Sequence, residues 1–271
     1  MVRRYPLGIL SMMLLAVFVL MALLAPWVAP YSYEAQDLAN VLAPPNAAHW
    51  FGTDDLGRDI LSRLIWGARP SLLVGVVGVG AGAIVGLPFG LLAGFRGGRA
   101  DRLIMGLVEV VLTFPSIVLS IAIVAVIGAG TLSVIIAIAV TTAPAIAVIA
   151  RASALSERNR DYVEAAHALG ASESRVIVRH ILRNIFPPVL TETTLRVSQA
   201  ILVAAALGFL GLGVQPPLPE WGTMLSQGRS YLAVAPHLTY FSGLFIALLV
   251  LGFNLAGDTL RDLYDPRLKD V

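Results

Sequence analysis

Cysteine is absent from the chain, and charged residues make up only 13% of its 271 residues. Without cysteine there can be no disulfide, no thiolate nucleophile and no sulfur ligand for a metal. The four histidines, His49, His167, His180 and His237, are scattered without the spacing of a metal site. A soluble domain carries about 25% charged residues. Half that share predicts a chain that lies in a membrane.

Apolar residues make up 57% of the sequence and gather in long runs. A run of about 20 residues is the length that an α-helix needs to cross about 30 Å of hydrocarbon. A membrane β-barrel would show alternating segments of about 10 residues instead, and none occur. The predicted fold class is therefore an all-α, polytopic membrane protein with six transmembrane helices. We place them at residues 7–29, 71–95, 103–127, 131–150, 189–213 and 238–257.

The first apolar run, Leu7 to Ala29, follows two arginines, as the core of a secretory signal does. It is longer than the 7–15 residues typical of such a core, so we interpret it as a retained span rather than a cleaved leader. With the N-terminus inside, fourteen of the 19 basic residues lie inside and four lie outside. The positive-inside rule then predicts that both termini are cytoplasmic.

The most polar internal stretch is YVEAAHALGASESRVIVRHIL, residues 162–182, between two apolar runs. Asp161 followed by Glu164 predicts the capped start of a short helix, and Gly170 predicts its left-handed end. Ser172 predicts the cap of a second helix. Four residues at helical spacing predict an apolar face that needs a partner: Tyr162, Ala165, Ala166 and Leu169. The alternative is a helix that lies flat on the lipid headgroups, anchored by its arginines.

Glycine recurs every four residues in the second predicted span, at Gly78, Gly82, Gly86, Gly90 and Gly94. Positions four apart stack on one helix face, so the stripe predicts a flat surface for close approach by another helix. We favour packing within the chain over packing against a second subunit.

The segment before that span has mixed charge and helical apolar spacing, which predicts an amphipathic helix on the outer membrane surface. Its charged residues Asp54, Asp55, Arg58 and Asp59 are candidate contacts for an external binding protein, or they brace the bundle. In the fifth predicted span, Glu192 and Arg196 stand four residues apart, and we interpret them as a structural ion pair.

The segment EAAHALG, residues 164–170, matches the EAA signature of ATP-binding-cassette (ABC) importer permeases: glutamate-alanine-alanine, three residues, then glycine. In that family the loop forms a coupling helix that docks into a groove on a cytoplasmic ATPase subunit. The resemblance implies that Glu164, Ala165, Ala166 and Gly170 make this contact, and we extend the docking site to Tyr162, Leu169, Ala171 and Ser172. The family often has proline thirteen residues after the glycine; here that residue is Arg183, so the resemblance does not fix where the second helix ends.

Three further stretches, residues 49–75, 205–232 and 253–268, resemble the C-type permeases of dipeptide, oligopeptide and nickel importers. The resemblance implies the type I ABC importer permease fold in a bacterial cytoplasmic membrane. The expected parts are residues 1–70, with the first span and an outer amphipathic segment, and residues 71–271, with five spans and a coupling loop at about 151–187.

The implied function is inward transport of di- or oligopeptides by alternating access. The implied partners are a B-type permease subunit, two ATPase subunits or domains, an external substrate-binding protein, the peptide and the lipid bilayer, with no nucleic acid. No GxxxxGK[ST] pattern occurs in the sequence, so the chain is expected to be a non-catalytic subunit. We expect no cofactor or metal on this chain, with ATP and Mg on the partner ATPases.

Three alternatives remain open from the sequence. The first is a permease of the same family for nickel or another small solute. The second is a secondary transporter, which would require mid-membrane acids or an inverted repeat. The third is a structural or assembly membrane protein, which would explain the glycine stripe but not the three stretches together.

Overall fold

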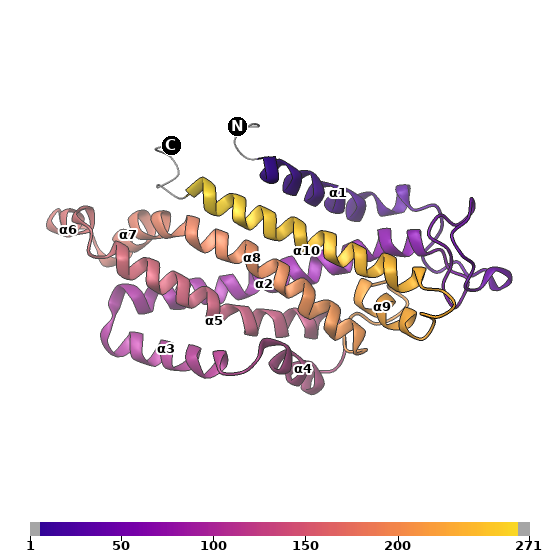
Figure 1. Cartoon of the computed structure of the whole chain (residues 1–271). Coiled ribbons are helices and arrows are strands. Elements are labelled where there is room, and N and C mark those ends of the chain that lie inside the picture. Colours follow the sequence, from indigo (N-terminus) through magenta and orange to yellow (C-terminus); the bar gives the residue numbers. More distant parts are fainter. Residues whose placement is uncertain (1–5, 265–271) are drawn as a thin grey trace.

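The computed structural model describes residues 6–264 and is an elongated bundle of helices, with no strand among those residues (Figure 1). The helices are α1 Pro6–Val28, α2 Ile60–Arg96, α3 Gly98–Leu112, α4 Ser116–Ile127, α5 Thr131–Glu157, α6 Asp161–Ala168, α7 Glu173–Val176, α8 Leu182–Phe209, α9 Trp221–Arg229 and α10 His237–Tyr264. A 3-10 turn, Leu38–Asn40, and a π-helical turn, Ile177–Ile181, complete them. Figure 1 places α6 at one end of the bundle and α9 at the other, which we call the α6 end and the α9 end.

Four of the described helices are long and apolar enough to cross a membrane: Leu7–Val28 of α1, all of α2, all of α5 and all of α10. The pair α3 and α4 meets the same test if the two are taken as one span. The 28 residues of α8 reach about 42 Å, which is long enough although less apolar. With α8 counted by its length, these are the six crossings that the sequence predicts. Arg3, Arg4, Arg267 and Lys269, on which the predicted orientation also depends, lie outside the described residues.

The third predicted span, residues 103–127, is wrong as a single straight helix. The axes of α3 and α4 differ by 88° across a short break. Pro115 has no backbone N–H and disfavours helical geometry at Phe114, so the helix cannot continue through this point. The sequence showed the proline but did not show how far the chain would turn.

The outer amphipathic helix and the second span are one helix, α2, which contains Pro70 and Pro88. The prediction of a separate helix lying on the membrane surface is therefore wrong, and the boundary expected at residue 70 falls inside a helix. The α9-end part of α2 is instead held in the bundle interior. There the Trp221 indole Nε1 donates to the Leu64 carbonyl at 3.0 Å, and both side chains are fully buried.

A second junction is also continuous. The chain runs from α7 through the π-helical turn directly into α8, with Pro187 and Pro188 inside α8. The second helix of the polar loop therefore has no separate end before the fifth span. From α7 to the end of α8 the chain is thus one continuous helical segment.

The glycine stripe of α2 lies against α5 of the same chain, in the most extensive helix pair of the bundle. A Cβ built on Gly86 would lie 2.3 Å from the Ala143 carbonyl oxygen, and one on Gly90 would lie 2.2 Å from that of Ala147. The α5 surface facing the stripe is itself made of small residues, so the two backbones touch. This contact holds α2 and α5 together as a rigid pair.

Candidate functional site

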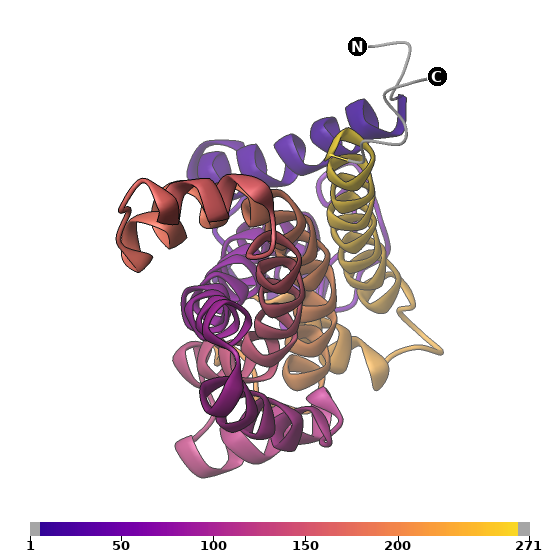
Figure 2. The ribbon, with the colours of Figure 1, turned by 90° about the vertical axis from the view of Figure 1, so that its left-hand side faces the viewer.

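The α6 loop, residues 161–172, projects from the bundle at the α6 end (Figures 1 and 2). Its first turn carries Asp161 and Glu164, which favour the positive end of the helix dipole. The helix has only eight residues, too few to be stable in isolation. Contacts with the rest of the chain must therefore hold it in place.

Those contacts come from a small hydrophobic cluster beneath the loop, which we call the α6-end cluster. Its buried members are Leu91, Ala154, Val163, Val176, Ile181 and Ile185. They come from α2, α5, α6, α7, the π-helical turn and α8, so one cluster joins the loop to three long helices. The buried Val163 is the residue through which α6 itself enters the cluster.

Hydrogen bonds of Tyr162 also connect the α6 loop to the helices beneath it. The Tyr162 hydroxyl donates to Glu157 Oε2 at 2.6 Å and accepts from Asn184 Nδ2 at 3.0 Å. Burial, and then the hydrogen bond to Glu157, raise the pKa of Tyr162 above its ordinary value. The phenol thus stays neutral and joins the end of α5 to the start of α8.

The predicted apolar face is divided by the structure. Tyr162 and Ala166 pack against the α6-end cluster, so the prediction of a single face containing them is wrong. Ala165 and Leu169 point outward together with Glu164 and with Ala168, which the sequence analysis did not select. Leu169 is 89% exposed. The cause is the burial of Val163 in the α6-end cluster, which fixes the rotation of α6 about its axis.

Gly170 ends α6 with a φ of +79°, in the left-handed region that the sequence predicts. The Ala171 N–H donates to the Ala166 carbonyl at 3.0 Å, as in a Schellman cap. Ser172 holds the cap position of α7, although its side chain makes no cap hydrogen bond. A Cβ added at Gly170 would meet no atom within 4 Å, so conformation alone favours glycine here.

For the importer function that the sequence resemblance implies, we expect Gly170→Val to lower transport roughly 5–30-fold, because a β-branched residue at positive φ is strained by about 1–2 kcal/mol. Gly170→Asn, which tolerates this conformation better, should retain most of the transport. Uptake of labelled substrate by membrane vesicles with matched protein amounts measures the difference. Equal uptake by the two variants would contradict a role for the cap geometry.

Ion pairs and backbone contacts also fix the helices beneath the loop. Arg151 of α5 donates to both carboxylate oxygens of Asp101 in α3, at 2.5 and 2.6 Å. Arg158 donates to the Gly94 carbonyl at the end of α2, at 3.1 Å. Neither interaction was identified from the sequence, because the partners are far apart in the chain.

The residues predicted to contact an external binding protein lie at the α9 end, in the segment between α1 and α2. Asp54, Asp59 and Arg58 are only 3%, 3% and 9% exposed, whereas Asp55 is partly exposed. Asp54 accepts hydrogen bonds from Arg58 Nε at 2.8 Å and from the Arg63 guanidinium. The structure turns three of the four residues inward, and the contact remains a prediction for Asp55 alone.

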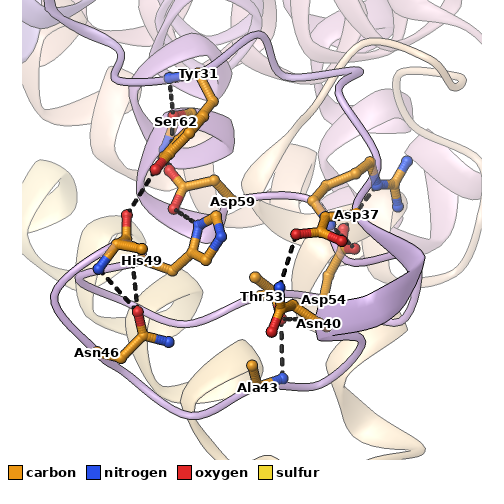
Figure 3. A network of polar contacts seen from close by, with 12 residues as sticks. Tyr31, Asp37, Asn40, Ala43, Asn46, His49, Thr53, Asp54, Asp59 and Ser62 are labelled. Atoms are coloured by element: carbon orange, nitrogen blue, oxygen red, sulfur yellow. Dashed lines mark hydrogen bonds and ion pairs between the residues drawn. The ribbon is translucent and has the colours of Figure 1, made fainter.

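Figure 3 shows the polar network that this segment forms. Asp59 accepts from the Ser62 hydroxyl at 2.6 Å and contacts His49 Nδ1 at 3.0 Å. The Ser62 hydroxyl in turn accepts from the Tyr31 N–H at 3.0 Å. The network ties the segment after α1 to the first turn of α2, which is the bracing role.

The predicted ion pair in the fifth span is present: Arg196 Nε lies 2.7 Å from Glu192 Oε1. Close by, a cleft of about 640 Å³ lies between α5, α8 and α10, with Glu192, Arg261 and Asn184 in its wall. The sequence analysis did not find this cleft. Across residues 6–264, no group of histidine and acidic side chains has the arrangement of a metal site.

Two family models match the chain. Residues 86–270 match the binding-protein-dependent transport system inner membrane component, and residues 2–45 match the N-terminal transmembrane domain of oligopeptide transport permease C. Together they cover both ends of the chain, including the α6 loop.

Proteins with similar sequences carry related names. The di/tripeptide transport system permease protein DppC of Pseudomonas aeruginosa is 50% identical, over 98% of this chain and 89% of that protein. The dipeptide transport system permease protein DppC of Alkalihalophilus pseudofirmus is 44% identical, over 98% of this chain and 88% of that protein. The glutathione transport system permease protein GsiD of Escherichia coli has the same identity and coverage.

A solved structure with a similar fold is that of the MetNI methionine ABC transporter in inward-facing conformations. The superposition has a TM-score of 0.62 and covers 76% of this chain and 98% of that chain, at 22% sequence identity. At this identity the similarity establishes the fold alone and nothing about the substrate.

Proposed function

The chain belongs to the family of binding-protein-dependent transport system inner membrane components, and we propose that it is one of two permease subunits of an ABC importer that moves di- and oligopeptides inward. The substrate class follows the names of similar proteins, which are di/tripeptide, dipeptide and glutathione transport permeases. Those names favour a peptide over nickel. We assign the chain a transport role without covalent chemistry.

One observation carries the mechanical part of the proposal: an 89% exposed leucine, Leu169, stands at the tip of a loop that is rigidly joined to the bundle. A large apolar side chain in this position is suited to enter a pocket on a partner. We propose that the partner is a cytoplasmic ATPase subunit. The docking residues are then Glu164, Ala165, Ala168 and Leu169, with Gly170 shaping the end of the helix.

The α6-end cluster explains how movement of the ATPase would reach the membrane. It connects α6 to α2 through Leu91, to α5 through Ala154 and to α8 through Ile185. Because these side chains are close-packed, a displacement of α6 moves the three helices with it rather than bending the loop. We propose that this motion opens the substrate path alternately to the two sides, at the interface with a similar second permease.

This mechanism requires that the α6 end is cytoplasmic, which agrees with the basic residues concentrated there. Arg96, Arg99, Arg102, Arg158 and Arg160 all lie near that end of the bundle. ATP and Mg would bind to the ATPase subunits, and an external binding protein would deliver the peptide at the α9 end. Both termini are then cytoplasmic, as part of the same proposal.

Photo-crosslinking at Leu169 tests the docking. The chain has no cysteine, so a Leu169→Cys variant carries one unique thiol for a photoactivatable maleimide. We expect illumination of the assembled complex to link this position to the ATPase subunit, because a side chain in its groove lies within reach of the label.

Val234→Cys is the matched control, because Val234 is 73% exposed but lies between α9 and α10 at the opposite end. It should give no ATPase adduct. If Leu169→Cys linked only to lipid while the ATPase remained in the complex, the docking proposal would be overturned.

A further inference from the structure

Among the long helices of the bundle, α8 is unusually polar in its middle. Thr191, Glu192, Thr193, Thr194, Arg196, Ser198 and Gln199 fall within three turns of a helix that packs between α2, α5 and α10. For this reason α8 alone, among the described helices of more than 25 residues, does not reach the apolarity of a membrane span. Such a helix is stable in a membrane bundle only if its polar side chains face protein or water rather than hydrocarbon.

The polar residues divide between two faces. Ser198 is buried and donates to Asn254 Oδ1 of α10 at 2.7 Å, which is a packing role. Glu192, Arg196 and Gln199 are spaced four and three residues apart, so they share another face. Gln199 is exposed, and the side chains of Glu192 and Arg196 are 20% and 32% exposed. This second face, which we call the α8 polar face, points away from the packed core.

Lipid is a poor neighbour for the α8 polar face. Charged side chains within membrane helices are costly against hydrocarbon and almost always face a bundle interior or a water-filled cavity. At the α6 end the face leads into the cleft of about 640 Å³ between α5, α8 and α10, whose wall includes Glu192, Arg261 and Tyr264. A volume of this size lies within the roughly 300–1,000 Å³ range of small-molecule pockets. Glu192, at the α6 end of the face, therefore borders a cleft that is large enough to hold water.

The backbone positions of Glu192 and Arg196 are separated by a distance that suits a short zwitterion, while their side chains pair with each other at 2.7 Å. Residues four apart on a helix are offset by about 6 Å along the axis, and an extended dipeptide spans about 7 Å. A carboxylate suits an α-ammonium group, and a guanidinium can bind a carboxylate through two parallel hydrogen bonds. The pair that Glu192 and Arg196 form with each other is partly exposed, so a competing substrate can replace it.

We propose that the α8 polar face lines the substrate path and that Glu192 receives the free amino end, and Arg196 the free carboxyl end, of a short peptide. Gln199, whose Oε1 accepts from Arg196 Nη1 at 2.9 Å, orients the guanidinium. This inference rests on the proposed peptide transport and names the residues through which this chain recognises the peptide ends.

Thiol labelling tests whether the face is in water. Gln199→Cys should react with a membrane-impermeant thiol reagent in the complex, and a dipeptide at transported concentrations should slow the reaction several-fold. The matched control is Ser198→Cys at the adjacent, buried position, which should not react. A Gln199→Cys variant that is unreactive from both sides of the membrane would overturn the proposal.

Transport kinetics test the recognition of the peptide ends, in proteoliposomes that contain the whole complex and its binding protein. We expect Arg196→Gln to lower kcat/KM for a free dipeptide by about tenfold, the effect of losing one charge-assisted contact. The same variant should transport the corresponding dipeptide amide as well as the unsubstituted complex does, because the amide has no carboxylate. Glu192→Gln should show the parallel pattern with an N-acetyl dipeptide.

A charge-swapped variant, Glu192→Arg with Arg196→Glu, separates recognition from packing. It keeps an ion pair on the helix but reverses the charges, so we expect ATPase stimulation to persist while uptake of the free dipeptide stays low. Restored uptake, or an equal loss for all three peptides, would show that the pair only stabilises the helix. Either result would leave the peptide-importer proposal intact, since its mechanical part depends on the docking of Leu169 and its substrate class on the names of similar proteins.

Discussion

Leu169→Asp is expected to reduce peptide uptake to background while the protein remains folded in the membrane. The Leu169 side chain is 89% exposed, so its replacement removes almost no internal packing. In the proposed complex the same side chain fills an apolar pocket on the ATPase, where truncation of an anchor typically costs at least about 2 kcal/mol. An aspartate there would also bury an unpaired charge. The combined loss corresponds to a reduction in docking affinity of at least about 30-fold.

Three measurements on Leu169→Asp separate loss of coupling from loss of folding. Abundance of the variant in the membrane should match that of the unsubstituted chain, whereas substrate-stimulated ATP hydrolysis and peptide uptake should both disappear. Leu169→Met is the matched control, because it preserves an unbranched apolar side chain of similar volume, and it should transport normally. Normal uptake by Leu169→Asp would remove the basis of the coupling mechanism.

The parts of this structure that the sequence could predict are those determined locally. Runs of apolar residues predict the long helices, because length and hydropathy decide which segments cross a membrane. The four-residue glycine period predicts a flat helix face, which the structure places against α5. The end of α6 at Gly170 follows from the one residue type that readily adopts positive φ.

Other features depend on contacts between distant residues, and the sequence analysis failed there. Spacing identified an apolar side of α6 but not its rotation, which depends on Val163 entering a cluster built from six elements. In the same way, the sequence alone suggests that Asp54 is an exposed acid, whereas the fold places the guanidinium groups of Arg58 and Arg63 against its carboxylate. Burial of a charged residue is a tertiary property, because it becomes tolerable only when a partner is in place.

The α8 polar face shows a third case, in which the residues were found but their surroundings were not. Glu192 and Arg196 were identified from their spacing as an ion pair, and the structure contains that pair. The cleft that Glu192 lines is formed by residues of α5, α8 and α10 together. A spacing rule contains no information about a space between helices, so the sequence could not connect the pair with a substrate path.

Gly90→Val is expected to prevent stable accumulation of the protein. A Cβ at this position would lie 2.2 Å from the Ala147 carbonyl oxygen and 2.8 Å from the Ala147 Cα, so the clash is with the backbone of α5. No rotamer change can relieve it, and α2 would have to separate from α5 along their whole contact. Overpacking of a core typically costs about 1–3 kcal/mol and occasionally more. We expect the upper end of that range, at least about 3 kcal/mol, because rigid helices transmit the displacement.

Gly80→Val in the same helix is the matched control, because no atom lies within 4 Å of the Cβ that it would introduce. Membrane abundance and thermal stability of the purified chain should be nearly unchanged for this variant. Abundance of Gly90→Val should fall several-fold or more, since a loss of even 1–2 kcal/mol changes cellular levels several-fold. Equal stability of the two variants would mean that α2 and α5 do not touch through the glycine stripe. The α6-end cluster also joins Leu91 of α2 to Ala154 of α5. Without a close contact between α2 and α5, this cluster would not be attached to a rigid helix pair. The proposed transmission of movement from α6 would then fail as well.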